Sequence, residues 1–105
     1  MKSKLISVTL CIIIILLLSA TCFADQGVVV AEHSGRCAIE YIGGYLLVEW
    51  FGGYSPSKSD IYTGENFNQF GMRDLYCVTS GTETKFWVED FMASKDKARK
   101  YVYRE

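Results

Sequence analysis

The pattern of apolar and polar residues between Arg36 and Gly53, RCAIEYIGGYLLVEWFGG, organises the rest of the chain. Two apolar-rich runs lie on either side of Gly43-Gly44, and a second glycine pair, Gly52-Gly53, ends the segment. Strand-forming runs around two glycines predict a β-hairpin with a type I′ turn, because glycine tolerates the positive φ that both turn positions require. We therefore expect an antiparallel pair of strands at the centre of the fold.

The hairpin has a defined register when the glycine pair forms the turn, and Ile39 then pairs with Val48. Strand side chains alternate between two faces. One face holds only uncharged side chains, namely Cys37, Ile39, Tyr41, Leu46, Val48 and Trp50. The other face includes both acids, Glu40 and Glu49, and is expected to meet water. A slip of one residue would bury these carboxylates, so the register should be strongly specified.

Further strand-like runs follow, separated by turns that contain glycine, serine or proline. We expect strands at 60–63, 73–78 and 83–92, with 28–31 as a short first strand or a pairing arm. Ser80-Gly81 is interpreted as the two-residue turn of a second hairpin, which places Leu75 opposite Phe86. Five strands with such turns predict a mainly β fold: a small five-stranded antiparallel sheet or a partly open barrel of SH3-like or OB-like pattern.

The segment 94–103, SKDKARKYVY, changes to a helical period. Ser94 is a suitable N-cap, and Asp96 in the first turn suits the helix dipole. One side of the helix is apolar and holds Ala98, Tyr101 and Val102. The pattern predicts a short C-terminal helix that closes one end or edge of the sheet.

Residues 1–24 have the three parts of a secretory signal peptide. Lys2 and Lys4 form a positive start, residues 5–18 form an apolar run, and Cys22-Phe23-Ala24 places small residues at the positions before a cleavage site. Such a segment directs export and is then removed. We therefore expect cleavage after Ala24, one small β domain over residues 25–105, and a secreted or periplasmic location.

Two alternatives remain open for this segment. An uncleaved membrane anchor would need roughly 20 apolar residues, and the apolar run is shorter, so we expect no stable membrane insertion after cleavage. Lipid attachment at Cys22 is the second alternative, with Thr21 before it where lipoprotein signals usually place Gly, Ala or Ser.

Two cysteines remain after the signal segment, Cys37 and Cys77, one in each half of the domain. An even number of cysteines in an exported chain predicts a disulfide, and both residues fall on faces that are expected to point inward. Closing a loop of about 40 residues would contribute roughly 4 kcal/mol in the chain-entropy model. Two cysteines and one histidine do not make a zinc site, and no C-x-x-C redox pair is present.

The net charge and the motifs of the sequence limit the classes of partner that we expect. The formal net charge of −1 becomes −3 when the two lysines of the signal segment leave without any acid. A weakly acidic surface of mixed sign gives no electrostatic reason to expect nucleic acid or an anionic membrane as partner. No metal-ligand spacing, phosphate loop or dinucleotide fingerprint is present, so the sequence predicts neither a metal nor a cofactor.

Candidate catalytic groups are few. His33 is the only histidine, and it lies in an expected turn without a nucleophile that it could activate. Glu40 and Glu49 are diagonal neighbours in the predicted register, roughly 7–8 Å apart, which is within the range of carboxylate pairs in glycoside hydrolases. That chemistry also needs a cleft, for which a domain of this size has little room. We therefore expect no enzymatic activity, with a glycan-active enzyme as the outlying alternative.

Aromatic side chains are more numerous than the inward faces require. The surplus comprises Tyr45, Phe51, Tyr54, Tyr62, Phe67, Phe70, Tyr76, Trp87 and Phe91. Tyrosine and tryptophan on a sheet face or in loops are common at recognition surfaces. We take Tyr54, Phe67, Phe70 and Trp87 as the candidate binding residues. The alternative is a second packing layer beneath the N-terminal arm and the C-terminal helix.

The sequence thus predicts a small exported, non-enzymatic binding module that docks a protein or cell-envelope partner through surface aromatics. A secreted inhibitor of a hydrolase, such as a lysozyme or a protease, is the alternative, because a rigid loop on a crosslinked domain suits that role. Neither the identity of the partner nor the oligomeric state follows from the sequence.

Overall fold

The computed structural model describes residues 24–104, so the predicted signal segment and its alternatives fall on residues outside the description, apart from Ala24. The described elements are β1 (Asp25–His33), β2 (Arg36–Tyr41), β3 (Gly44–Gly53), β4 (Ile61–Gly64), β5 (Gly71–Cys77), β6 (Thr82–Ala93) and α2 (Lys95–Tyr103). Within residues 24–104 no helix has both the length and the apolar content that crossing a membrane requires.

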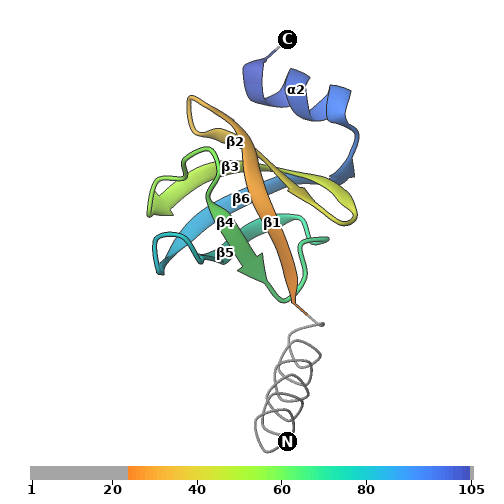
Figure 1. Cartoon of the computed structure of the whole chain (residues 1–105). Coiled ribbons are helices and arrows are strands. Elements are labelled where there is room, and N and C mark those ends of the chain that lie inside the picture. The colour runs from red at the N-terminus through yellow and green to blue at the C-terminus, as the bar shows by residue number, and fades with distance from the viewer. Residues whose placement is uncertain (1–23, 105) are drawn as a thin grey trace, which may run out of the picture.

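The strands form a closed antiparallel barrel in the order β1-β2-β3-β6-β5-β4 (Figure 1). Val28 of β1 pairs with Glu40 of β2 on one side and with Ile61 of β4 on the other, and this double pairing closes the ring. The predicted mainly β fold with a C-terminal helix is confirmed. The barrel has six strands and is closed, because the segment expected to be a short arm is a nine-residue strand.

Inward-facing side chains fill the barrel. The buried cluster consists of Val29, Cys37, Ile39, Tyr41, Leu46, Val48, Tyr62, Phe67, Leu75, Cys77, Phe86 and Val88. The predicted faces of the central hairpin are therefore confirmed from Cys37 to Val48, and Glu40 on the opposite face is exposed. Trp50 was expected inside but is exposed, because it lies beyond the start of β2 and its backbone N–H bonds to the carbonyl of Gly35 in the preceding turn.

The register of both hairpins differs from the prediction by two residues. Ile42 and Gly43 form the first turn, so Ile39 pairs with Leu46 and not with Val48. In the second hairpin Leu75 pairs with Thr84 and not with Phe86, which leaves a longer connection than Ser80-Gly81. A shift of two residues keeps every side chain on its face, and the predicted core survives for that reason.

Gly44 explains why the first turn is displaced. It lies in β3 with φ +133°, and a Cβ at this position would be 2.9 Å from the carbonyl oxygen of Ala93 and 3.2 Å from the Cα of Met92. Glycine is needed here because β6 approaches the backbone of β3 closely. Of the two glycines in the predicted type I′ turn, only Gly44 has a positive φ, so that turn assignment is wrong.

The predicted disulfide between Cys37 and Cys77 is not formed, and both thiols are free and buried. Cys37 lies on β2 and Cys77 on β5, which are opposite walls of the six-stranded ring. Strands about 4.8 Å apart and tilted by about 40° enclose a barrel roughly 12 Å across. A disulfide spans Cα atoms no more than about 7 Å apart, so inward-facing cysteines on opposite walls do not meet its geometry.

Helix α2 packs on the outer face of the barrel wall, over β2 and β3 (Figure 1). Ser94 is its N-cap, as predicted, and the Ser94 Oγ accepts a hydrogen bond from the backbone N–H of Lys97 at 3.2 Å. The contact buries Ala38, Leu47, Ala93, Ala98 and Val102. The predicted position at an end or edge is wrong, because the barrel has closed its edges and the outward-facing Ala38 and Leu47 provide an apolar seat.

We expect the mature protein to contain two free thiols that react only after unfolding. Cys37 and Cys77 are fully buried, burial raises the pKa of the Cys37 thiol to about 12, and the thiolate is the reactive form. Iodoacetamide labelling without reductant, read by intact mass, should give no adduct in native buffer and two in denaturant. A mass lower than the reduced mass by two hydrogens would show that the bridge forms after all.

Candidate functional site

Phe67 does not belong to a binding surface, contrary to the prediction. Its side chain is 1% exposed and packs edge-to-face on the ring of Tyr41, with ring centroids 5.3 Å apart. Its backbone N–H donates to a carboxylate oxygen of Asp25 at 2.7 Å. The loop between β4 and β5 thus inserts Phe67 into the barrel as a plug. The polar residues around Phe67 in the sequence suggested a surface loop and concealed this.

Tyr54 is half-buried and packs against the core. Its carbonyl oxygen accepts a hydrogen bond at 2.7 Å from the Thr84 hydroxyl, which also bonds to the Tyr62 hydroxyl at 2.7 Å. Thr84 is fully buried, so this chain satisfies polar groups that would otherwise be costly inside the barrel. Tyr54 therefore has an anchoring role and presents only part of its ring.

Phe70 and Trp87 are exposed, as the binding hypothesis requires. Phe70 is 65% exposed and stacks on Phe91 of β6, with ring centroids 4.6 Å apart. Trp87 is 41% exposed on the outer face of β6 and pairs directly with Met72 of β5. Side chains directly opposite one another on a sheet are in contact distance. The structure thus exposes two of the four predicted binding residues: Trp87 on the outer face of β6, and Phe70 just before β5, where it stacks on a Phe91 that packs against the barrel core.

The exposed members of this region define a surface that we call the aromatic band, namely Phe51, Phe70, Met72 and Trp87. Phe91, on which Phe70 stacks, is half-buried and packs against the barrel core. Met72 lies two residues after Phe70 and pairs with Trp87 across the β5–β6 ladder. Phe51 is exposed on β3. It lies two residues after Glu49, and Glu49 is the cross-strand partner of Trp87 on β6. Sequence reasoning missed Met72, because its place beside Trp87 follows only from the β5–β6 register.

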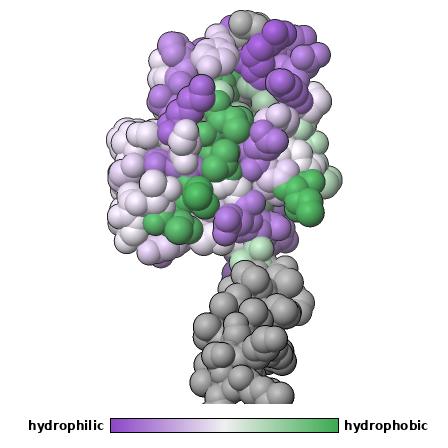
Figure 2. Space-filling model, viewed as in Figure 1, coloured by the Kyte–Doolittle hydropathy of each residue, from purple (hydrophilic) through white to green (hydrophobic). Residues whose placement is uncertain are grey.

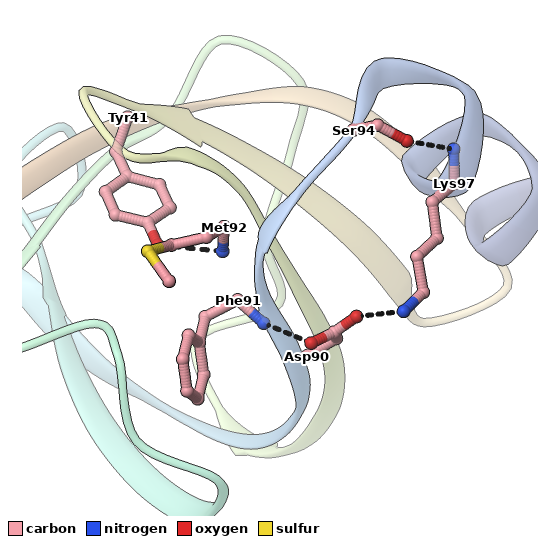
Figure 3. A network of polar contacts seen from close by, with 6 residues as sticks. All are labelled: Tyr41, Asp90, Phe91, Met92, Ser94 and Lys97. Atoms are coloured by element: carbon pink, nitrogen blue, oxygen red, sulfur yellow. Dashed lines mark hydrogen bonds and ion pairs between the residues drawn. The ribbon is translucent and has the colours of Figure 1, made fainter.

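The bend that ends β6 holds Phe91 in position (Figure 3). Met92 has φ +52°, an uncommon conformation for a residue with a side chain. Its backbone N–H donates to the Tyr41 hydroxyl at 3.0 Å, and that hydroxyl donates in turn to the side-chain oxygen of Asn68. Burial raises the pKa of Tyr41, so the hydroxyl keeps the proton that it donates.

Asp90 ties the same bend to the helix. One carboxylate oxygen accepts the backbone N–H of Phe91 at 2.9 Å, and the other forms an ion pair with the Lys97 ammonium (Figure 3). The hydrogen bond from Lys97 holds the pKa of Asp90 below its usual value. The Tyr41 and Asp90 contacts together fix the direction in which the chain leaves the barrel wall, and with it the outer end of the band.

Charged side chains surround the band with a clear excess of acids. Outward-facing acids on these strands are Glu49 of β3, Asp74 of β5, and Glu83 and Glu89 of β6. Lys85 is the outward-facing base on β6, and it pairs with Asp74 across the ladder. The Nε1–H of Trp87 donates to a carboxylate oxygen of Glu89 at 3.1 Å, which fixes the orientation of the indole.

A second candidate site is a groove of about 410 Å³ between α2 and the outer face of β1 and β2. Figure 2 shows hydrophobic side chains in the middle of this side of the molecule and hydrophilic ones above them around the helix. The lining residues are Val30, Ala31, Ala38, Glu40, Tyr45, Lys95, Asp96, Ala98, Arg99 and Tyr103. Two acids and two bases balance at the rim, so the groove has no preference for ligand charge.

The predicted carboxylate pair is not formed. In the β2–β3 ladder, Glu49 pairs with Arg36 and Glu40 pairs with Tyr45. Arg36 and Glu40 are four residues apart on β2. Four residues of strand separate the two carboxylates by about 13 Å, beyond the range used for glycoside hydrolysis, and α2 covers the wall between them. His33 is exposed, with its ring centroid 5.8 Å from that of Tyr103. No group of three or more His, Cys, Asp or Glu residues is arranged for a metal within residues 24–104.

Comparisons of this chain with protein families, with curated proteins and with solved structures find no match. Function is therefore argued from the geometry of the aromatic band, the acids around it, and the turn at Ile42. These three features are built on paired strands or on turns fixed by backbone contacts, so their positions relative to one another are determined by the barrel.

We expect Tyr41→Phe to destabilise the protein by about 1–3 kcal/mol, because it removes the acceptor of the Met92 N–H and the donor to Asn68. Urea unfolding followed by tryptophan fluorescence measures this loss. Tyr103→Phe, which changes an exposed tyrosine of α2, is the matched control and should shift stability by less than about 0.5 kcal/mol. Equal midpoints for the two variants would show that the Tyr41 hydroxyl does not hold the bend.

Proposed function

We propose that this protein is a small exported, non-enzymatic binding module, and that the aromatic band docks a protein partner, either free or in the cell envelope. The observation that carries the proposal is the cross-strand pairing of two exposed apolar side chains, Met72 and Trp87, with the exposed Phe70 two residues before Met72. Large apolar side chains are thereby gathered on one wall and left in contact with water. The signal-like segment 1–24 is the basis for expecting export.

The composition of the band supports docking more than packing. Tryptophan, phenylalanine and methionine are enriched in protein interfaces, and tryptophan is enriched among the residues that carry most of the binding energy. Methionine adds a flexible side chain that adapts to a partner surface. Met72 and Trp87 stand on paired strands, so little backbone entropy is lost when a partner binds.

The other apolar surface is less suited to this role. Val28, Val30 and Ile61 lie on the outer face of β1 and β4 and are each half-buried. β-branched aliphatic residues are the usual occupants of strands, and Val30 already lines the groove beneath α2. This surface is explained by strand formation and helix packing, whereas the exposure of Trp87, Phe70 and Met72 is not.

We expect the double variant Met72→Ala with Trp87→Ala to reduce partner capture at least tenfold, since residues at the centre of an interface cost about 2 kcal/mol or more when truncated. The measurement is a pull-down from the native exported fraction with immobilised residues 25–105, quantified by mass spectrometry. Trp50→Ala is a matched control, because Trp50 is 40% exposed, against 41% for Trp87, but faces the other side of its strand.

The same set of proteins captured by wild type and by the Met72→Ala, Trp87→Ala variant would reject the aromatic band as the docking surface. Loss of capture in the Trp50→Ala control as well would also reject it, since the effect would then not be specific to the band. Circular dichroism of each variant confirms that the barrel is intact before capture is compared.

A second candidate function, inhibition of a hydrolase, is supported by the turn between β2 and β3. Ile42 is 100% exposed at the tip of this two-residue turn. The close approach of Gly44 to Ala93 fixes the base of the turn. An apolar side chain on a rigid, projecting turn is suited to enter the active-site pocket of a lysozyme or protease with little loss of entropy.

If this candidate is correct, residues 25–105 should inhibit at least one member of a panel of lysozymes and proteases, and Ile42→Ser should weaken that inhibition at least tenfold. Val78→Ser is the control, because Val78 is an exposed aliphatic residue in another turn. Initial-rate assays over a concentration series measure the inhibition constants. Inhibition that Ile42→Ser leaves unchanged, or no inhibition of any enzyme in the panel, would reject this candidate.

A further inference from the structure

We propose that the surface which docks on the aromatic band is cationic, and that one of its lysine or arginine side chains lies on Trp87 between Glu49 and Glu89. This inference rests on the proposed docking function of the band and adds the chemistry of the partner. It is carried by two observations: the position of the two carboxylates around the indole, and the absence, among the described residues, of an ion pair to either of them.

The two carboxylates flank Trp87 from different strands. Glu49 of β3 is the direct cross-strand partner of Trp87, and Glu89, two residues along β6, accepts the hydrogen bond from the indole N–H. Tyr101 of α2 provides an independent sign that they converge. The pKa of Tyr101 is raised to about 12, chiefly by burial, with Arg36 lowering it and Glu49 and Glu89 contributing to the rise. Both acids therefore act on one phenol beside the band.

Two basic residues, Arg36 and Lys85, lie on the strands beside these carboxylates, and neither forms an ion pair with them. Arg36 is the cross-strand partner of Glu49 on β2, but its guanidinium lies over the Tyr101 ring at 4.8 Å and donates to the Tyr101 carbonyl oxygen at 3.2 Å. Lys85 faces Asp74 across the β5–β6 ladder. Within residues 24–104 neither Glu49 nor Glu89 forms an ion pair, and the bridge that is formed joins Asp90 to Lys97. The carboxylates beside Trp87 thus remain available to an external cation.

This arrangement matches the requirements of a cationic side chain. An ammonium or guanidinium over an indole gains a cation–π attraction, and its charge is met by the carboxylates on either side. Neighbouring aliphatic carbons of the same lysine or arginine would cover Met72 and the indole edge. The exposed acids Glu83 and Asp74 extend the negative field along the wall, and such a field also raises the rate of association with a positive partner.

A second copy of this chain is the competing occupant. α2 and its C-cap hold five of the nine basic residues of residues 25–105, and Lys95, Lys100 and Arg104 among them are exposed. A helix of one copy on the band of the next would make a head-to-tail contact. We favour an external partner because Lys97 is already paired with Asp90 of its own chain and because Tyr101 of the helix borders the band, which limits the space for a second helix.

The test uses residues 25–105, a synthetic peptide of alternating lysine and leucine, and its glutamate and leucine counterpart. Trp87 indole N–H shifts in NMR titrations report binding at the site. We expect the lysine peptide to bind and the glutamate peptide not to bind. Glu49→Gln with Glu89→Gln should weaken binding of the lysine peptide at least tenfold, and raising ionic strength from about 0.05 M to about 0.5 M should weaken it in the wild type.

The substitutions have a matched control. Glutamine at position 89 keeps an oxygen that accepts the indole N–H, so the ring orientation is preserved while the charge is removed. Glu32→Gln with Glu65→Gln removes the same charge from exposed acids away from the band, and should change the affinity by less than twofold. Sedimentation velocity of the wild type tests the second copy as occupant.

Three results would overturn the inference: equal binding of the two peptides, shifts that leave the Trp87 indole unmoved, and a concentration-dependent dimer that the Glu49→Gln, Glu89→Gln variant abolishes. The proposed function can fail separately. If Met72→Ala with Trp87→Ala abolishes partner capture while the charge variant leaves it intact, docking through the band stands and the cationic partner is rejected. If neither variant affects capture, both proposals are rejected.

Discussion

The fold depends on the double pairing of β1, which bonds to β2 along one side and to β4 along the other. This pairing closes the sheet on itself and places the large inward side chains in one continuous core. Without it, β2 and β4 would be edge strands, and the inward residues of the remaining sheet would face water. Phe67 and Asp25 reinforce the closure, because the hydrogen bond between them ties the loop after β4 to the first residue of β1.

Closure also explains where the helix and the aromatic band lie. A filled barrel has no space for a further element inside, so α2 packs outside, where Ala38 and Leu47 offer an apolar seat. The wall formed by β5 and β6 receives no such cover. Its outward residues are therefore exposed, because no element covers them. Trp87, Met72 and the acids among them make this wall both apolar and negatively charged.

The sequence was sufficient to predict most of the strand residues that face inward, because a two-residue period survives any register shift of two. Trp50, which is exposed, and Tyr62, which is buried in the core, are the exceptions. Ile39, Val48 and Phe86 are inside for this reason, and Ser94 caps the helix through a local bond that the sequence alone indicates. The register itself depends on the approach of β6 to Gly44, a contact between segments far apart in the chain. The positions of Cys37 and Cys77 in the sequence also do not reveal that their strands, β2 and β5, form opposite walls of the barrel.

The same limit applies to the candidate site. Trp87 and Phe70 were identified from aromatic residue type and expected position, and both are exposed. Phe67 was assigned to the surface because its neighbours are polar, and only the long-range contact with Tyr41 reveals that it is buried. Glu49 and Glu89 belong to separate strands, and their common position around Trp87 is decided by the β3–β6 pairing.

The closed ring has a further consequence for recognition. Each strand already has a neighbour on both sides, so most backbone donors and acceptors are used within the barrel, and the shortest ladder is the one of two residue pairs between β4 and β5. The ring therefore offers little free edge to which an extended peptide could add as a further strand, which is a common way for β domains to hold a ligand. Under the proposed binding function, recognition would then pass mainly through side chains, and selectivity would be set by the shape and charge of the barrel walls, whatever secondary structure the ligand has.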